Sequence, residues 1–261
     1  MILAVKTTPQ LRDKYNVLLA CLAGTDIMNG ALGQPLFIAE LIYRLNGSPA
    51  SEFCIIPFAA RRFIRTSLMS SLLHLTLISI ERYISVKFPF KYEDIVTKRR
   101  LVASVILAWL LLAFPLILSS FYTNNVLRSI LLMLTTFPSI LILIFGRTAT
   151  YYEARNQMRK IKTRQISSAA AATFLKERKA FRTTTYVIVV VLLCYIPNGL
   201  FRVFFVHVIS SPETFLATEA FMLTILFWNS AFNPVIYCAR SRDYRRAFKK
   251  LISRGNYVQP V

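Results

Sequence analysis

The stretch Asn229-Ser230-Ala231-Phe232-Asn233-Pro234-Val235-Ile236-Tyr237 ends a long apolar segment and is followed at once by basic, amphipathic residues. Pro234 has no backbone N–H donor, so it is expected to kink a helix at this place. Asn233 needs polar partners if it lies inside a membrane, because an unpaired amide is costly to bury. An asparagine and a proline together in a membrane-length helix therefore indicate a functional feature.

Apolar residues make up 55% of the 261-residue chain, yet its net charge is +20. This combination argues against a soluble domain and against a nucleic-acid binder, and it fits apolar membrane spans with basic flanks. We predict an all-α membrane protein with one transmembrane domain covering residues 1–261. Each predicted span can cross a ~30 Å hydrocarbon core as a helix; the spans are 15–43, 53–86, 100–121, 126–152, 180–209 and 214–239.

Two further segments are expected to be helical without crossing the membrane. Residues 241–252 carry Tyr244, Phe248 and Leu251 at helical spacing opposite basic residues, a pattern that is typical of an interfacial helix. The polar interval 153–179 contains an alanine run and many charges, so it should extend the two helices that it joins into the cytosol.

Lysine and arginine concentrate in alternate connections and after the last span. The positive-inside rule places these connections in the cytoplasm, where their charge can also bind anionic membrane lipids. The glycosylation sequon Asn46-Gly47-Ser48 falls in a connection on the opposite side, which makes Asn46 a candidate acceptor and agrees with this orientation.

The triplet Glu81-Arg82-Tyr83 ends the second span at its cytoplasmic side, and an arginine at the membrane edge needs a partner. Together with the N-P-x-x-Y run, this triplet resembles the rhodopsin-like (class A) G-protein-coupled receptors. The resemblance implies that Glu177 pairs with Arg82 in the resting state and that Phe90 docks into the G-protein α subunit. The residues so assigned to coupling and the activation switch are Glu81, Arg82, Tyr83, Phe90, Glu177, Asn233, Pro234 and Tyr237.

Asp26 lies in the middle of the first apolar segment, where a carboxylate is a functional hypothesis by default. The resemblance groups it with other oxygen donors, namely Ser71, Asn229, Ser230 and Asn233. Hard cations prefer such ligands. The resemblance implies an allosteric sodium ion that favours the inactive state, and no other cofactor; the alternative is a hydrogen-bonded cluster without an ion.

The run Cys194-Tyr195-Ile196-Pro197 resembles the C-W-x-P hinge of the family, with Tyr195 in place of tryptophan and Pro197 as the kink. Other positions depart from the family. Pro57 stands where a disulfide cysteine is usual, and the next outer loop is short, which is similar to the branch with the melanocortin, cannabinoid and sphingosine-phosphate receptors. Gly146 stands where members of the family have a tyrosine. Residues 1–5 read like the last turn of the family's first helix, so we expect a seven-helix bundle with six spans present.

The ligand is constrained by which charges the outer halves of the spans carry. Residues 214–237 contain no lysine for a retinal Schiff base, and residues 53–75 contain no acid for an amine. The expected ligand-binding residues are Arg61, Arg65, Arg202 and Glu219. Arginine suits carboxylate and phosphate, so the predicted ligand carries an acidic group. Alternatively, the arginines extend to the outer lipid headgroups.

No catalytic motif of an enzyme is present, and no nucleic-acid partner is expected. The sequence predicts a multi-pass receptor of the plasma membrane that binds an extracellular ligand and catalyses nucleotide exchange on a heterotrimeric G protein. One rival is a six-span transporter, which should show inverted repeats. The other rival is a truncated product without signalling of its own, acting as a decoy or a dimer partner.

Overall fold

The computed structural model describes residues 2–8, 13–46, 55–121, 125–163, 168–201, 204 and 211–255. Within these ranges the side chains at 55–61, 114–133, 135, 160–163, 168–181, 212 and 251–255 are not described. The described chain is helical without strands. The long helices are α2 (Lys14–Met28), α3 (Gln34–Leu45), α4 (Ile55–Lys87), α6 (Lys98–Phe121), α7 (Asn125–Thr163), α8 (Ser168–Leu200) and α9 (Pro212–Arg240).

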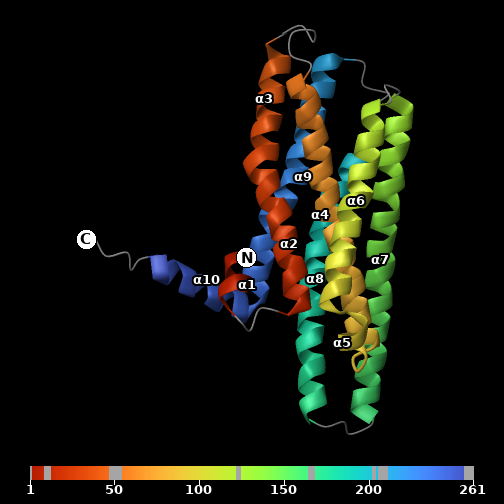
Figure 1. Cartoon of the computed structure of the whole chain (residues 1–261), viewed down its shortest axis with the longest axis vertical. Coiled ribbons are helices and arrows are strands. Elements are labelled where there is room, and N and C mark those ends of the chain that lie inside the picture. Colours follow the sequence, from red (N-terminus) through yellow and green to blue (C-terminus); the bar gives the residue numbers. More distant parts are fainter. Residues whose placement is uncertain are drawn as a thin grey trace, which may run out of the picture.

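The long helices run side by side along the longest axis of the molecule, and α7 and α8 project beyond the others at the end where α5 (Tyr92–Ile95) lies (Figure 1). The inner parts of α7 and α8 contain most of residues 153–179, the polar interval that the sequence predicted to extend two helices. The short α1 (Ile2–Thr7) packs against α2 and α10 (Arg242–Gly255). Helix α10 turns away from the long axis (Figure 1), as an interfacial helix does. We call the end with α5 and α10 the inner end.

A π-helical turn, Asn29–Gly33, joins α2 and α3 into one continuous rod. Such turns often occur at functional sites. A Cβ atom at position 33 would lie 2.7 Å from Oδ1 of Asn29, so any larger residue there would displace the Asn29 side chain. The turn therefore places the Asn29 side chain over the backbone of Gly33 and close to α9, next to the polar residues described below.

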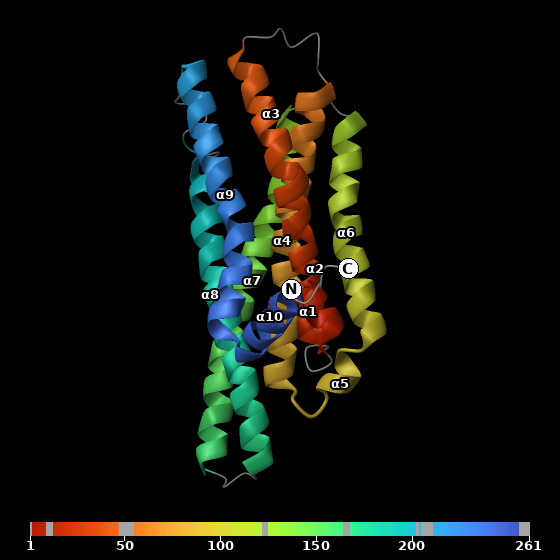
Figure 2. The ribbon, with the colours of Figure 1, turned by 90° about the vertical axis from the view of Figure 1, so that its left-hand side faces the viewer.

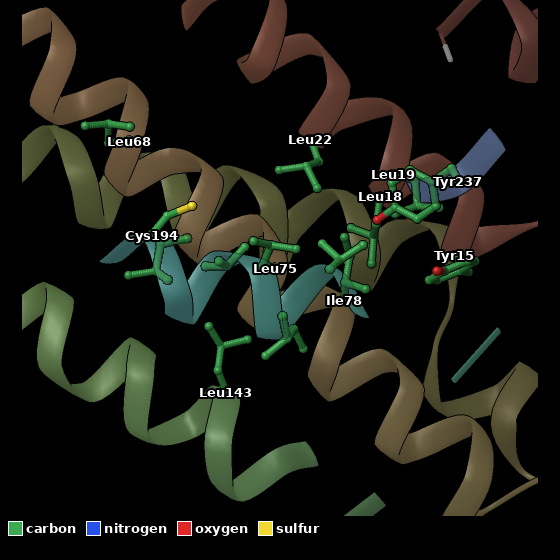
Figure 3. Close-up of a cluster of buried hydrophobic side chains, with 14 of the residues drawn as sticks. Tyr15, Leu18, Leu19, Leu22, Leu68, Leu75, Ile78, Leu143, Cys194 and Tyr237 are labelled. Atoms are coloured by element: carbon green, nitrogen blue, oxygen red, sulfur yellow. The ribbon is translucent and has the colours of Figure 1, made fainter. Parts of the chain in front are cut away.

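Helix α4 lies at the centre of the bundle and contacts α2, α3, α6, α7 and α8. In Figure 2, α6 lies on the opposite side of the bundle from α8 and α9, which contact each other. The buried core collects apolar side chains from α2, α4, α7 and α8 (Figure 3). This arrangement leaves the inner end of α4, with Arg82, beside the start of α2, α5 and the inner half of α8.

The outer faces of the helices are apolar. On α6, for example, large apolar side chains are exposed at Val102, Ile106, Leu107, Leu110 and Leu111. Three stretches of the described chain are long and apolar enough to cross a membrane, namely Arg62–Lys87, Arg182–Leu200 and Glu213–Arg240. An apolar exterior is what contact with the hydrocarbon core of a membrane favours.

Candidate functional site

Arg82 is buried near the inner end of α4, with 4% of its surface exposed. Its Nε and Nη2 atoms donate to the two carboxylate oxygens of Glu81 at 2.6 and 2.5 Å. The Tyr92 hydroxyl of α5 donates to Glu81 Oε1 at 2.5 Å. On its other side, the guanidinium carbon lies 4.2 Å from the ring centroid of Tyr15. The buried charge of Arg82 is thus balanced by a bidentate carboxylate and by an aromatic face.

The other residues predicted for coupling are placed around Arg82. Phe90 follows α4 in a turn and is 95% exposed, so its ring is available to a partner. The Tyr83 hydroxyl accepts from Lys87 Nζ at 2.7 Å. Glu177 belongs to α8, but its side chain lies outside the described residues. The pairing of Arg82 with Glu177 therefore stays a prediction.

Two residues at the start of α2 join this cluster, and sequence reasoning missed both. The Tyr15 hydroxyl is hydrogen-bonded to Thr184 Oγ1 of α8 at 3.0 Å. The Asn16 side chain accepts from the hydroxyl of Tyr244 in α10 at 2.9 Å. Burial raises the pKa of the Tyr244 phenol, which keeps this donor protonated. A tyrosine and an asparagine opening an apolar segment were the signal that could have revealed them.

Tyr237, the last residue of the N-P-x-x-Y run, is 1% exposed and packs with its ring 6.1 Å from that of Tyr244. Its hydroxyl is buried and has no hydrogen-bond partner among the described residues. A buried unsatisfied hydroxyl is costly, so a rearrangement that gives it a partner would be favoured. The role of Tyr237 in an activation switch stays a prediction.

Helix α7 approaches α4 closely at Gly146, the position where the resemblance leads us to expect a tyrosine. A Cβ atom at this position would lie 3.0 Å from the Ser79 hydroxyl oxygen. The next residue, Arg147, is buried and donates through Nη2 to the hydroxyl of Thr185 in α8. A second buried arginine, which sequence reasoning also missed, thus lies at the inner half of the bundle.

A polar network lies deeper in the bundle, around Asp26. Asn233 donates through Nδ2 to Asp26 Oδ2 at 2.8 Å, which joins α9 to α2. Asn29, in the π-helical turn, donates to the Ser230 hydroxyl at 3.2 Å. The Thr25 and Ser71 hydroxyls are 3.4 Å apart, which adds α4. The structure therefore brings Asp26 and Asn233 into direct contact and adds two residues, Thr25 and Asn29, that the sequence did not indicate.

Several oxygens of this network are buried and have no hydrogen-bond partner among the described residues: Asp26 Oδ1, Asn29 Oδ1 and Asn229 Oδ1. A carboxylate and two amide oxygens without donors are chemically suited to a hard cation. The residue types present are therefore compatible with the ion that the sequence suggested, and its binding stays a prediction.

The hinge run has an anchor between α8 and α4. Tyr195 is buried, and its hydroxyl donates to the backbone carbonyl of Leu68 at 2.6 Å. Pro197 lies in the same helix two residues further on. The tyrosine that replaces tryptophan therefore contributes a direct hydrogen bond from α8 to the central helix.

At the outer end, Glu219 of α9 forms an ion pair with Arg44 of α3, with Nη1 and Oε2 3.4 Å apart. The same arginine pairs with Glu40 at 2.6 Å, and Glu40 is buried. Arg65 is half-buried on α4, whereas the side chains of Arg61 and Arg202 lie outside the described residues. Asn46 is exposed directly after α3, and the rest of its sequon is not described.

Comparison with known proteins now identifies the family. The sequence model of the 7 transmembrane receptor (rhodopsin family) matches residues 1–237. The histamine H2 receptor of Rattus norvegicus is 30% identical over an alignment covering 95% of this chain and 73% of that receptor. The octopamine receptor beta-1R of Drosophila melanogaster is 30% identical, covering 70% and 45%, and the trace amine-associated receptor 5 of Mus musculus is 25% identical, covering 97% and 80%.

The chain belongs to the rhodopsin family of seven-transmembrane receptors. It is a multi-pass membrane protein and a G-protein-coupled receptor, which binds an extracellular ligand and catalyses nucleotide exchange on a heterotrimeric G protein. It is a receptor and not a metabolic enzyme. The matches do not favour the non-signalling alternative.

Proposed function

We propose that Arg82 is the residue that couples the receptor to its G protein, and that Phe90 docks beside it. The observation that carries this proposal is a buried arginine held by its neighbour Glu81 at the inner end of the central helix. An arginine held within its own helix can turn towards a partner without unfolding the bundle. Asn233, Pro234 and Tyr237 would permit that change from α9, and Glu177 would oppose it from α8.

The test measures nucleotide exchange on purified G proteins by the receptor in lipid nanodiscs, without ligand and with each ligand candidate. Arg82→Ala should lower exchange at least tenfold at equal receptor amount. Arg99→Ala is the matched control, since Arg99 is an exposed arginine at the start of α6. Equal exchange by Arg82→Ala and the unchanged receptor would overturn the assignment.

We further propose that Asp26, Ser71, Asn229, Ser230 and Asn233 hold a sodium ion. The unpartnered buried oxygens of Asp26 and Asn229 support this proposal. A bound sodium ion would supply positive charge that favours the resting arrangement, and its affinity would fall when agonist binds.

The test is a thermal unfolding series of the purified receptor in NaCl and in N-methylglucamine chloride at equal ionic strength. Sodium should raise the midpoint in the unchanged receptor and not in Asp26→Asn. Asp94→Asn, at an exposed aspartate of α5, should keep the sodium effect. If both salts give the same midpoint for the unchanged receptor, the cluster is a hydrogen-bonded network without an ion.

For the ligand, the arginines Arg61, Arg65 and Arg202 support a molecule with an acidic group, such as an anionic lipid or an acidic peptide. A second candidate is an amine. The relatives named above are a histamine receptor, an octopamine receptor and a trace amine-associated receptor, and the outer end holds the carboxylates Glu40 and Glu219. Two other features favour a different branch of the family. Pro57 replaces the usual disulfide cysteine and the next outer loop is short, which is similar to the branch with the melanocortin, cannabinoid and sphingosine-phosphate receptors.

The two ligand classes are separated by paired variants. A response to an acidic ligand should be lost in Arg65→Gln and kept in Glu40→Gln, and a response to an amine should show the reverse. A response that neither variant changes would place the pocket elsewhere.

We place the receptor in the plasma membrane, with α10 on the inner leaflet. Tyr244 and Ala247 face the bundle, whereas Arg242, Arg245, Arg246, Lys249 and Lys250 are exposed. This distribution supports contact with anionic lipids.

A further inference from the structure

Tyr15 of α2 contacts two other helices at once. Its hydroxyl is 3.0 Å from Thr184 Oγ1 on α8, and its ring lies 4.2 Å from the guanidinium carbon of Arg82 on α4. Both Tyr15 and Thr184 are buried. Figure 3 shows Tyr15 at one end of the apolar cluster that joins α2, α4, α7 and α8.

The helix that carries Tyr15 is itself held in place. The next residue, Asn16, is hydrogen-bonded to Tyr244 of α10, and Tyr15 lies in the first turn of α2. Because α2 is fixed on this side, a displacement of α8 away from α4 must break the Tyr15–Thr184 hydrogen bond. A turn of Arg82 towards a G protein must likewise remove its guanidinium from the Tyr15 ring.

We propose that Tyr15 is a positioning residue that stabilises the resting receptor through two separate contacts. Its hydroxyl holds α8 to α2 through Thr184, and its ring holds Arg82 against Glu81. The second part rests on the proposed coupling role of Arg82. Tyr15 lies in the first turn of α2 at the inner end, where it acts on the equilibrium between the resting and the open arrangement.

The variants separate the two contacts. Tyr15→Phe and Thr184→Val each remove the hydrogen bond and keep the ring over Arg82. Tyr15→Leu removes both contacts. Tyr186→Phe is the matched control, because it removes a hydroxyl from a half-exposed tyrosine on the same helix, two residues from Thr184.

The first measurement does not need a G protein. Spin labels at Arg182→Cys, at the inner part of α8, and at Lys98→Cys, at the start of α6, report the separation of these helices in a background without native cysteines. Both positions are exposed. Loss of one neutral hydrogen bond should raise the ratio of open to resting receptor about 2- to 10-fold.

Tyr15→Phe and Thr184→Val should each produce this increase, and the double variant should equal either single variant because both remove the same bond. Tyr186→Phe should leave the distance distribution unchanged. The second measurement is basal nucleotide exchange at equal receptor amount. It should rise in the same proportion, and Tyr15→Leu should exceed Tyr15→Phe because Arg82 is also released.

The outcomes are distinguishable. If neither Tyr15→Phe nor Thr184→Val changes the distance distribution, the proposal is wrong, and Thr184→Val decides the matter should the Tyr15 variants fail to fold. If the open population rises while exchange does not, the Tyr15–Thr184 contact does hold the resting state, and the coupling role of Arg82 is what fails.

Discussion

Arg82 and Glu81 are sequence neighbours whose side chains meet in a bidentate ion pair, although consecutive residues on a helix usually point apart. The contact is stabilised by its surroundings: Tyr92 donates to the same carboxylate, and the Tyr15 ring covers the guanidinium. Breaking a buried ion pair by removing one partner is costly, because it leaves an uncompensated charge. The pair therefore holds Arg82 in its buried position, and under the proposed coupling role a G protein would have to break it.

Glu81→Gln should release Arg82. We expect basal nucleotide exchange to rise and the free energy of unfolding to fall by about 1–3 kcal/mol, because glutamine keeps an acceptor but loses the charge. Glu93→Gln is the control, since Glu93 pairs with Lys14 while 80% of its side chain is exposed, and exposed pairs contribute little. Equal effects of the two substitutions would contradict a special role of the buried pair.

At the scale of the elements, the π-helical turn between α2 and α3 decides how the Asp26 region meets α9. The turn places Asn29 over Gly33 and within 3.2 Å of Ser230. The contact depends on backbone geometry, because a regular α-helix would rotate every later residue of α3 relative to α2.

Gly33→Ala should destabilise the receptor by about 1–2 kcal/mol, because the new Cβ displaces the Asn29 side chain and costs its bond to Ser230. Gly30→Ala in the same turn meets no atom within 4 Å and should be neutral or stabilising by up to ~1 kcal/mol. Thermal unfolding of the purified variants checks both. A smaller loss for Gly33→Ala than for Gly30→Ala would refute the interpretation.

At the scale of the whole molecule, α8 is held to the rest of the bundle at two depths. Tyr195 bonds to the Leu68 carbonyl in the middle of α4, and Thr184 bonds to Tyr15 near the inner end. The two positions on α8 are eleven residues apart, about 16 Å along a helix. A swing of α8 as one body must break both contacts.

Tyr195→Phe and Thr184→Val should therefore have additive effects on the free-energy difference between the resting and open receptor, within about 0.5 kcal/mol. The spin-label distances between α8 and α6 give this quantity for each single variant and for the double variant. A double variant that equals the stronger single variant would show that the two contacts do not break together, so that α8 bends between Thr184 and Tyr195.

Much of the architecture follows from the sequence, since long apolar segments can satisfy their backbone groups in a membrane only as helices. The N-P-x-x-Y and E-R-Y runs indicated the family, and Asp26 with Asn233 indicated a polar network, because buried polar groups among apolar residues need partners. These are local rules that length, periodicity and residue type express directly. The partner that pairs with Arg82 from another helix, the ion and the ligand stay predictions.

Only the tertiary structure decided which distant residues meet. Tyr15 reaches Thr184 across 169 positions and Asn16 reaches Tyr244 across 228, and each looked like an ordinary polar residue at the end of an apolar segment. The ion pair between Glu219 and Arg44 could not be predicted from the sequence either, because the sequence had suggested Glu219 only as a ligand-binding residue. The physical reason is that a sequence fixes which groups need partners, whereas helix rotation, the π-helical turn and close approach at small residues determine which partners lie within hydrogen-bonding distance.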